Sequence, residues 1–190
     1  GGPGAFIVVG PGVYAEEGLR LGGAPERKDL MVLVGDSSGV LTEDEPGPVI
    51  LDAQGGEGPS VGGPLLLDGI QLTGAGAAGL RILSNARDVT VRHATVCGNG
   101  GDGVVSFAAG LDLANNLLCG NAGTGVRLSL RRARGYSRLI NNTLAGNGSG
   151  IFLNDSTGQP TRARLWNNVV SGNLGDGITL RARAAGSPAR

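Results

Sequence analysis

A nine-residue motif ending in Gly-Asn occurs four times in the chain, and this repeat limits the possible folds more than any other feature. The copies are Val91–Asn99, Leu113–Asn121, Leu139–Asn147 and Leu165–Asn173, and their final Asn residues are 22, 26 and 26 positions apart. A repeat length of about 20 to 50 residues indicates a solenoid, in which each repeat packs on its neighbours along one axis.

The pattern inside each repeat predicts strands. Helical repeats need about ten or more residues whose apolar positions recur every 3.6 residues, and this sequence contains no such segment. Apolar residues instead alternate in short runs, as in Ile151–Leu153 and Ile178–Leu180, and Gly or Asn interrupts the runs every four to eight residues. This punctuation predicts three short strands in each coil of the solenoid.

The Asn residues mark two bends in each coil. Asn tolerates left-handed backbone angles better than other non-glycine residues, so it can turn a strand sharply. One bend is predicted at Asn115/Asn116, Asn141/Asn142 and Asn167/Asn168, and a second at the Gly-Asn pairs 98–99, 120–121, 146–147 and 172–173. Stacked Asn side chains should form hydrogen-bonded ladders along the axis. The aliphatic residues between the bends, Val96, Leu118, Leu144 and Val170, should stack inward.

These repeats resemble those of right-handed parallel β-helix proteins of the pectate-lyase-like superfamily. The opening segment Ile7–Glu17, followed by Leu30–Asp36 and Val49–Asp52, is similar to the first coils of carbohydrate-active members. The resemblance implies an all-β, single-stranded right-handed parallel β-helix, and counting the repeats predicts about seven coils. We expect one domain, 1–190, with irregular coils over 1–62, regular repeats over 63–181 and a tail over 182–190. This solenoid hosts many chemistries, so it implies no activity.

Composition excludes several other classes of protein. The chain contains 37 glycines without a period of three, which excludes collagen. No apolar run reaches the ~18 residues of a membrane span.

Charge is distributed unevenly along the chain. Residues 1–80 contain 11 acids and 3 bases, whereas residues 81–190 contain 5 acids and 13 bases. The basic part should attract anions, but the zero net charge and few aromatic residues argue against nucleic acid.

Arginines give the main candidate binding surface. One coil contains Arg127, Arg131, Arg132, Arg134 and Arg138. The same region contains Arg162 and Arg164 in the next coil and begins with Arg181 and Arg183 in the last. Because equivalent positions of a solenoid stack, these arginines are predicted to form one ridge. Related β-helices hold extended sugars on the strands that follow the repeat glycine. The outward row predicted there is Arg81, Val105, Arg127, Phe152 and Thr179, with Phe107 and Asn154 beside it. We therefore predict that an acidic polysaccharide contacts Arg81, Phe107, Arg127, Phe152, Asn154, Arg132, Arg138 and Arg164. The alternative is that these arginines only keep a lysine-poor protein soluble.

The two cysteines and the single histidine occupy repeat positions. Cys97 and Cys119 lie one coil apart, and a strand spacing of about 4.8 Å falls within the Cα range of a disulfide. In-register parallel positions fit the disulfide torsion poorly, so free thiols are favoured and a disulfide is the alternative. His93 stands where other repeats have the first Asn of a bend, so a bend residue is favoured over a general base.

Three further motifs carry little functional weight. Gly74–Gly79 matches the dinucleotide-binding pattern, but a predicted strand follows it where that motif needs a helix. Asp102 and Asp176 occupy the same bend, and because the coils between them offer no acid there, turn chemistry is favoured over calcium. We therefore predict no cofactor. The glycosylation-like motifs at Asn141, Asn147 and Asn154 coincide with predicted bends and a loop of the repeat and are interpreted as incidental.

The sequence contains no complete catalytic set, so it leaves enzymatic activity open. We favour a noncatalytic module, secreted, periplasmic or at the cell surface, that binds an acidic polysaccharide or another surface polymer. The first alternative is a polysaccharide lyase, epimerase or hydrolase, or a fragment of one. The second is a structural spacer or adhesin segment, in which the acidic and basic halves of neighbouring copies favour end-to-end self-association.

Overall fold

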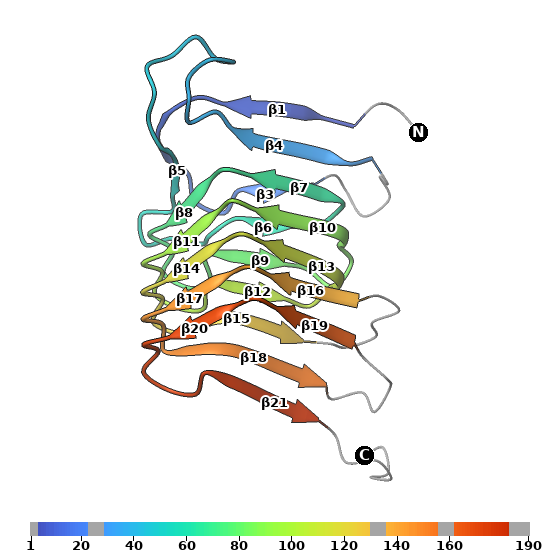
Figure 1. Ribbon diagram of the computed structural model, residues 1–190. Coiled ribbons are helices and arrows are strands. Elements are labelled where there is room, and N and C mark those ends of the chain that lie inside the picture. The colour runs from blue at the N-terminus through green and yellow to red at the C-terminus, as the bar shows by residue number, and fades with distance from the viewer. Residues whose placement is uncertain (1–3, 23–28, 130–135, 156–161, 183–190) are drawn as a thin grey trace.

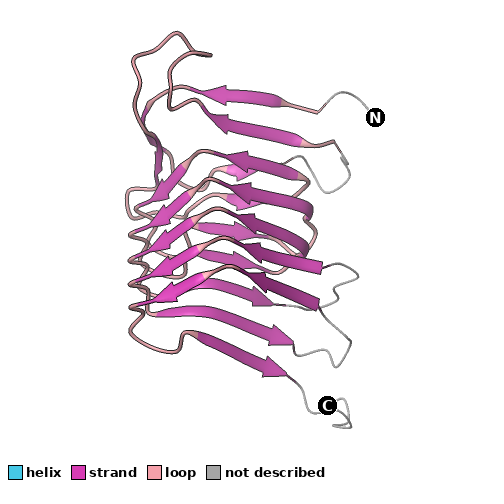
Figure 2. Ribbon diagram, in the orientation of Figure 1, coloured by secondary structure: helices cyan, strands magenta, loops and turns pink. Residues whose placement is uncertain are grey.

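A computed structural model describes residues 4–22, 29–129, 136–155 and 162–182 of the chain. They form three parallel sheets of seven strands each, and the described residues contain no helix (Figures 1 and 2). The chain passes through the three sheets in turn and so makes about six full turns from the first strand of a sheet to the seventh. The predicted parallel β-solenoid is therefore confirmed, with about six turns where the repeat count predicted about seven coils.

We name the sheets A, B and C in the order in which the chain enters them. Sheet A contains β1 (Phe6–Val9), β4 (Met31–Gly35), β7 (Leu65–Asp68), β10 (Arg87–Arg92), β13 (Ala109–Ala114), β16 (Tyr136–Ile140) and β19 (Arg162–Trp166). Sheet B contains β2 (Gly12–Ala15), β5 (Val49–Asp52), β8 (Gln71–Thr73), β11 (Thr95–Cys97), β14 (Leu117–Cys119), β17 (Thr143–Ala145) and β20 (Val169–Ser171). Sheet C contains β3 (Arg20–Leu21), β6 (Ser60–Val61), β9 (Leu80–Ile82), β12 (Val104–Ser106), β15 (Thr124–Ser129), β18 (Ser149–Asp155) and β21 (Ile178–Ala182).

The strands pair in the register that the repeat predicts. In sheet B, Val96 pairs with Leu118, Leu118 with Leu144, and Leu144 with Val170. The first three of these side chains are fully buried, and Val170 packs against the same core from the last coil. Each coil thus adds one aliphatic layer to a continuous core, which supplies the hydrophobic stabilisation of the solenoid.

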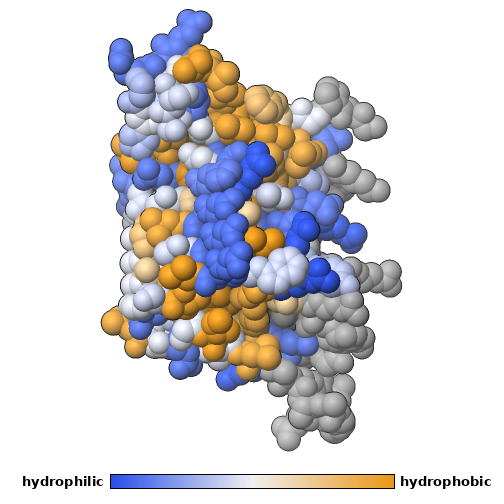
Figure 3. Space-filling view, in the orientation of Figure 1, coloured by the Kyte–Doolittle hydropathy of each residue, from blue (hydrophilic) through white to orange (hydrophobic). Residues whose placement is uncertain are grey.

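Left-handed residues turn the chain from sheet A to sheet B. His93, Asn115, Asn141 and Asn167 have φ values of 49°, 57°, 55° and 52°, so His93 is confirmed as a bend residue. These four exposed residues follow one another along the axis, and Figure 3 shows a hydrophilic band at this corner. His93 Nδ1 lies 2.8 Å from Asp68 Oδ1, and the same carboxylate accepts a hydrogen bond from Arg92 Nε. At the next corner, four glycines of the Gly-Asn pairs have positive φ, namely Gly98, Gly120, Gly146 and Gly172.

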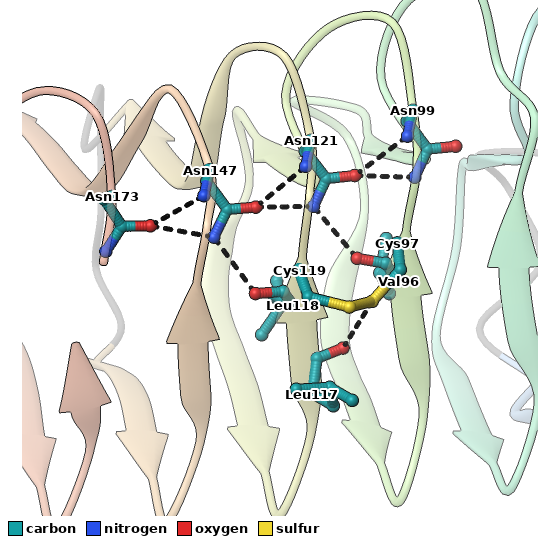
Figure 4. The surroundings of a disulfide bond; sticks show 9 residues. All are labelled: Val96, Cys97, Asn99, Leu117, Leu118, Cys119, Asn121, Asn147 and Asn173. Carbon is teal, nitrogen blue, oxygen red and sulfur yellow. Dashed lines mark hydrogen bonds between the residues drawn. A yellow bond between two sulfur atoms is a disulfide. The ribbon is translucent and has the colours of Figure 1, made fainter. Parts of the chain in front are cut away.

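Two ladders of Asn side chains run through the bends. The first joins Asn116, Asn142 and Asn168, and each amide nitrogen donates to the Oδ1 of the next Asn at 2.9 and 3.0 Å. The second joins Asn99, Asn121, Asn147 and Asn173 at 2.8 to 3.1 Å (Figure 4). Both predicted ladders are therefore confirmed, and they satisfy buried backbone groups that no sheet pairs.

The last described coil leaves core positions uncovered. Ile178 and Leu180 are 56% and 66% exposed, whereas the paired residues of the preceding coil, Ile151 and Leu153, are buried. The end-to-end self-association expected from the sequence stays a prediction. No helix among the described residues has both the length and the apolar character needed to cross a membrane.

Candidate functional site

An open cleft of about 400 Å³ lies on the outer face of sheet A. It extends over four neighbouring coils, and its lining residues come from β10, β13, β16 and β19. They are Asp88, Val89, Thr90, Gly110, Asp112, Tyr136, Arg138 and Arg164. Sequence reasoning found Arg138 and Arg164 but missed the other six.

The register of sheet A brings these residues together. Thr90 pairs with Asp112, Asp112 with Arg138, and Arg138 with Arg164, so one outward column of side chains runs along the cleft. Their neighbours Val89, Leu113 and Leu139 are buried in the core, because successive residues of a strand point to opposite faces.

A backbone irregularity opens one end of the cleft. Asp88 and Gly110 lie in β10 and β13 with φ values of 53° and 80°, between the pairs Arg87–Ala109 and Val89–Leu111. Left-handed angles are uncommon for residues other than glycine. A methyl group placed on the Cα of Gly110 would meet no atom within 4 Å, so space remains beside Asp88.

Two of the four charges in the cleft neutralise each other. Arg138 Nε donates to Asp112 Oδ1 at 2.7 Å, and Arg138 Nη2 donates to Asp112 Oδ2. Such a two-point contact between arginine and a carboxylate fixes both side chains. Within the part of the chain that the structure describes, no hydrogen bond or ion pair engages the Asp88 carboxylate, and no carboxylate pairs with Arg164.

Arg164 lies between two aromatic rings at the other end of the cleft. Its guanidinium carbon is 5.2 Å from the ring centre of Tyr136 and 5.5 Å from that of Trp166. These distances are within the range of cation–π contacts. Trp166 is 51% exposed, so this cluster presents a flat, partly apolar surface with a cation at its centre.

The outward row predicted on sheet C is only partly available to a ligand. Arg81, Val105, Arg127, Phe152 and Thr179 do stack in register as predicted. However, Arg127 Nε donates to Asp102 Oδ2 at 2.5 Å, and its guanidinium carbon lies 5.0 Å from the Phe152 ring centre. Val105, predicted to face outward to solvent, is buried with 7% exposure. Arg127 and Phe152 therefore already contact other groups of the protein and are less available to a ligand.

The described arginines of the predicted ridge lie in two sheets, and a single ridge that joins them stays a prediction. Arg127 and Arg181 lie in sheet C, whereas Arg138, Arg162 and Arg164 lie in sheet A, because a corner of the solenoid separates the two sets. Among the other predicted contacts, Phe107 follows β12 and is 38% exposed, and Asn154 pairs with Ser129 and Arg181 in sheet C. Arg131, Arg132, Arg134 and Arg183 lie outside the described residues.

Comparison with known proteins places the fold in a family. Residues 52–188 match the family model described as the right-handed beta helix region. The chain belongs to the right-handed β-helix family. No curated protein and no solved structure matches the chain significantly. The chemistry of this β-helix must therefore be argued from its own surface.

The cysteines of the β-helix form a disulfide on the outer side of sheet B (Figure 4). The expectation that free thiols prevail is wrong. Cys97 pairs directly with Cys119 in the parallel register, and their Cα atoms are 4.6 Å apart, within the range that a disulfide bridges.

The two predicted bend aspartates have different partners. Asp102 accepts hydrogen bonds from Arg127 and, at 2.6 Å, from the backbone N–H of Thr124, whereas Asp176 accepts one from the Thr179 hydroxyl. The strand Leu80–Ile82 follows Gly74–Gly79, as predicted against nucleotide binding. The described residues contain no cluster of three or more His, Cys, Asp or Glu side chains that could hold a metal.

The Asp102–Arg127 pair should make stability depend on acid pH. Burial acts to raise the pKa of Asp102, but the hydrogen bond from Arg127, that from Thr124 and the Arg127 charge hold the pKa below its ordinary value of 3.8. A lowered pKa in the folded state stabilises the fold at every pH above 3.8, and this contribution disappears as the pH falls through the folded value. Because Arg127 is 40% exposed, solvent screening limits the effect to about 1 kcal/mol.

We therefore expect Asp102→Asn to lower the free energy of unfolding by about 1 kcal/mol at neutral pH, with the difference from wild type shrinking below pH 3.8. Urea titrations monitored by circular dichroism across this pH range provide the measurement. Asp176→Asn, in the equivalent bend of the last coil, should have a smaller effect at neutral pH. A difference between Asp102→Asn and wild type that persists unchanged in acid would contradict this account.

Proposed function

We propose that this β-helix is a noncatalytic module, outside the cytoplasm, that binds an acidic polysaccharide along the cleft of sheet A. The cluster of Arg164, Tyr136 and Trp166 is the observation that carries the proposal. An arginine fork matches the geometry of a carboxylate, and aromatic rings provide flat apolar surface for the faces of sugar rings.

The shape of the cleft supports a polymer as ligand. Its lining spans strands of four coils, and at a strand spacing of about 4.8 Å this corresponds to roughly 14 Å along the axis. The cleft is open to solvent, so an extended chain can lie along it. A long ligand on an exposed surface suits binding by several weak contacts along its length.

A noncatalytic role is favoured because the Asp112 carboxylate is already hydrogen-bonded to Arg138. Both of its carboxylate oxygens accept hydrogen bonds from Arg138, which fixes the group as part of the cleft wall. The described residues offer no metal cluster of the kind that calcium-dependent lyases need. Together these observations support binding more than bond cleavage.

Removing the cation of the cleft should weaken binding about tenfold. Arg164→Gln keeps a polar side chain but loses the charge-assisted contact to a carboxylate, a loss of about 1.4 kcal/mol or more. Calorimetric titration with oligogalacturonates measures the effect, and fluorescence of Trp166, the single tryptophan, gives a second readout.

Arg81→Gln is the matched control, because Arg81 is an exposed arginine of the sheet C row. It should leave the affinity nearly unchanged. If Arg81→Gln weakened binding and Arg164→Gln did not, the ligand would lie on sheet C. If neither wild type nor any variant bound an acidic oligosaccharide of any composition, the proposed function would be wrong.

The alternative function is glycoside hydrolysis, which is favoured by one observation. Asp88 and Asp112 line the same cleft, and hydrolases of glycosides use two carboxylates about 5–9.5 Å apart. Incubation with polysaccharides and assay of new reducing ends tests this alternative. Activity that Asp88→Asn and Asp112→Asn each abolish would identify the β-helix as a hydrolase.

A further inference from the structure

We propose that the ligand of the sheet A cleft is zwitterionic, with a protonated amine beside Asp88 and a carboxylate beside Arg164. This inference rests on the proposed function and narrows its substrate class. It assigns the ligand as a glycan that contains both uronate units and amino sugars with free amines.

The charge pattern of the cleft is the first support. Asp112 and Arg138 neutralise each other in the middle, so Asp88 and Arg164 remain as single charges of opposite sign at the two ends. Asp88 lies on β10 and Arg164 on β19, three strand steps apart, which is about 14 Å along the axis. A ligand that complements both charges must therefore carry its cation and its anion on different sugar units.

The surroundings of Asp88 provide the second support. Its side chain is exposed, and the open space above Gly110 lies beside it in the cleft. Asp88 has a left-handed φ of 53°, an angle that aspartate tolerates better than most non-glycine residues. Its carboxylate has no partner among the described residues and is therefore available to a ligand.

A uniformly anionic polymer fits the cleft less well. Its carboxylates would approach Arg164 at one end but face the like charge of Asp88 at the other. Like charges across an interface oppose binding and so select against the wrong partner. A protonated amine beside Asp88 replaces this repulsion by an ion pair. An N-acetyl group at the same place carries no charge, so the ion pair and its contribution to affinity are lost.

The test compares two forms of one oligosaccharide. Alternating uronate–glucosamine oligomers with free amines are titrated calorimetrically beside the same oligomers after N-acetylation. We expect the free-amine form to bind about fivefold more tightly to wild type, the effect of one exposed ion pair. Asp88→Asn should abolish this preference, and Asp176→Asn, which removes an exposed acid outside the cleft, should keep it.

The outcomes separate this inference from the proposed function. Equal affinity of the two forms for wild type, with Arg164→Gln still weakening both, would overturn the zwitterionic ligand and leave the binding module intact. Loss of the preference in Asp176→Asn as well as in Asp88→Asn would also overturn it, because the effect would then come from net charge. Failure of every oligomer, oligogalacturonates included, to bind would instead refute the proposed function.

Discussion

Replacing Asn142 by Ala is expected to lower the free energy of unfolding by about 3–5 kcal/mol. The Asn142 side chain is almost fully buried and lies in the middle of the first ladder. Its Nδ2 donates to the Leu113 carbonyl and to Asn168 Oδ1, and its Oδ1 accepts from the backbone N–H and the amide of Asn116. The substitution leaves the Leu113 carbonyl and the Asn116 N–H buried without these partners, and each such group costs about 1–3 kcal/mol.

The adjacent residue provides the control for this prediction. Asn141 is exposed at the same bend and has a φ of 55°, which glycine adopts without steric cost. Asn141→Gly should therefore change stability by about 0.5 kcal/mol or less. Urea unfolding followed by circular dichroism measures both variants. Equal losses in the two variants would show that the bend, rather than the buried amide, provides the stabilisation.

The strand register could be predicted because each coil repeats the same contacts. A residue such as Leu118 meets Val96 and Leu144 at equivalent positions, so aligning the motif copies also aligns their side chains in space. The left-handed bends followed from the same alignment, since only a few residue types adopt such angles readily. His93 could be assigned to a bend by this reasoning, although it is not an Asn.

The cleft was harder to predict because its residues precede the motif. Asp88, Gly110 and Tyr136 each stand three positions before the first residue of a repeat copy, so extending the alignment upstream would have placed them at one repeat position. Their residue types differ from coil to coil, so they form no recognisable motif. Only Asp88 carries a local signal, because aspartate tolerates left-handed backbone angles better than most non-glycine residues.

One signal in the sequence could have located part of the cleft. Asp112, Arg138 and Arg164 each stand directly before the first Leu of a repeat copy, so they occupy one column. Opposite charges at equivalent positions of consecutive coils predict a cross-strand ion pair, as Asp112 and Arg138 form. Asp68 and Arg92, paired in the same way two strands earlier, follow the same rule.

Reduction of the Cys97–Cys119 disulfide is expected to lower the free energy of unfolding by about 3 kcal/mol. The bond joins residues separated by 22 positions and thus closes one coil of the unfolded chain into a loop. Restricting a loop of this size removes conformational entropy from the unfolded state, which stabilises the folded state. Backbone hydrogen bonds pair β11 with β14 independently of the sulfur atoms, so the solenoid itself should survive reduction.

Urea unfolding in the presence and absence of a reductant measures this effect, and the double variant Cys97→Ser/Cys119→Ser provides the control. The variant should resemble the reduced wild type and should not respond to the reductant. A shift of the variant by the reductant would show that the effect does not come from this bond. Unchanged stability of the reduced wild type would contradict this account and would mean that residual contacts between these two strands already restrict the unfolded chain as much as the disulfide does.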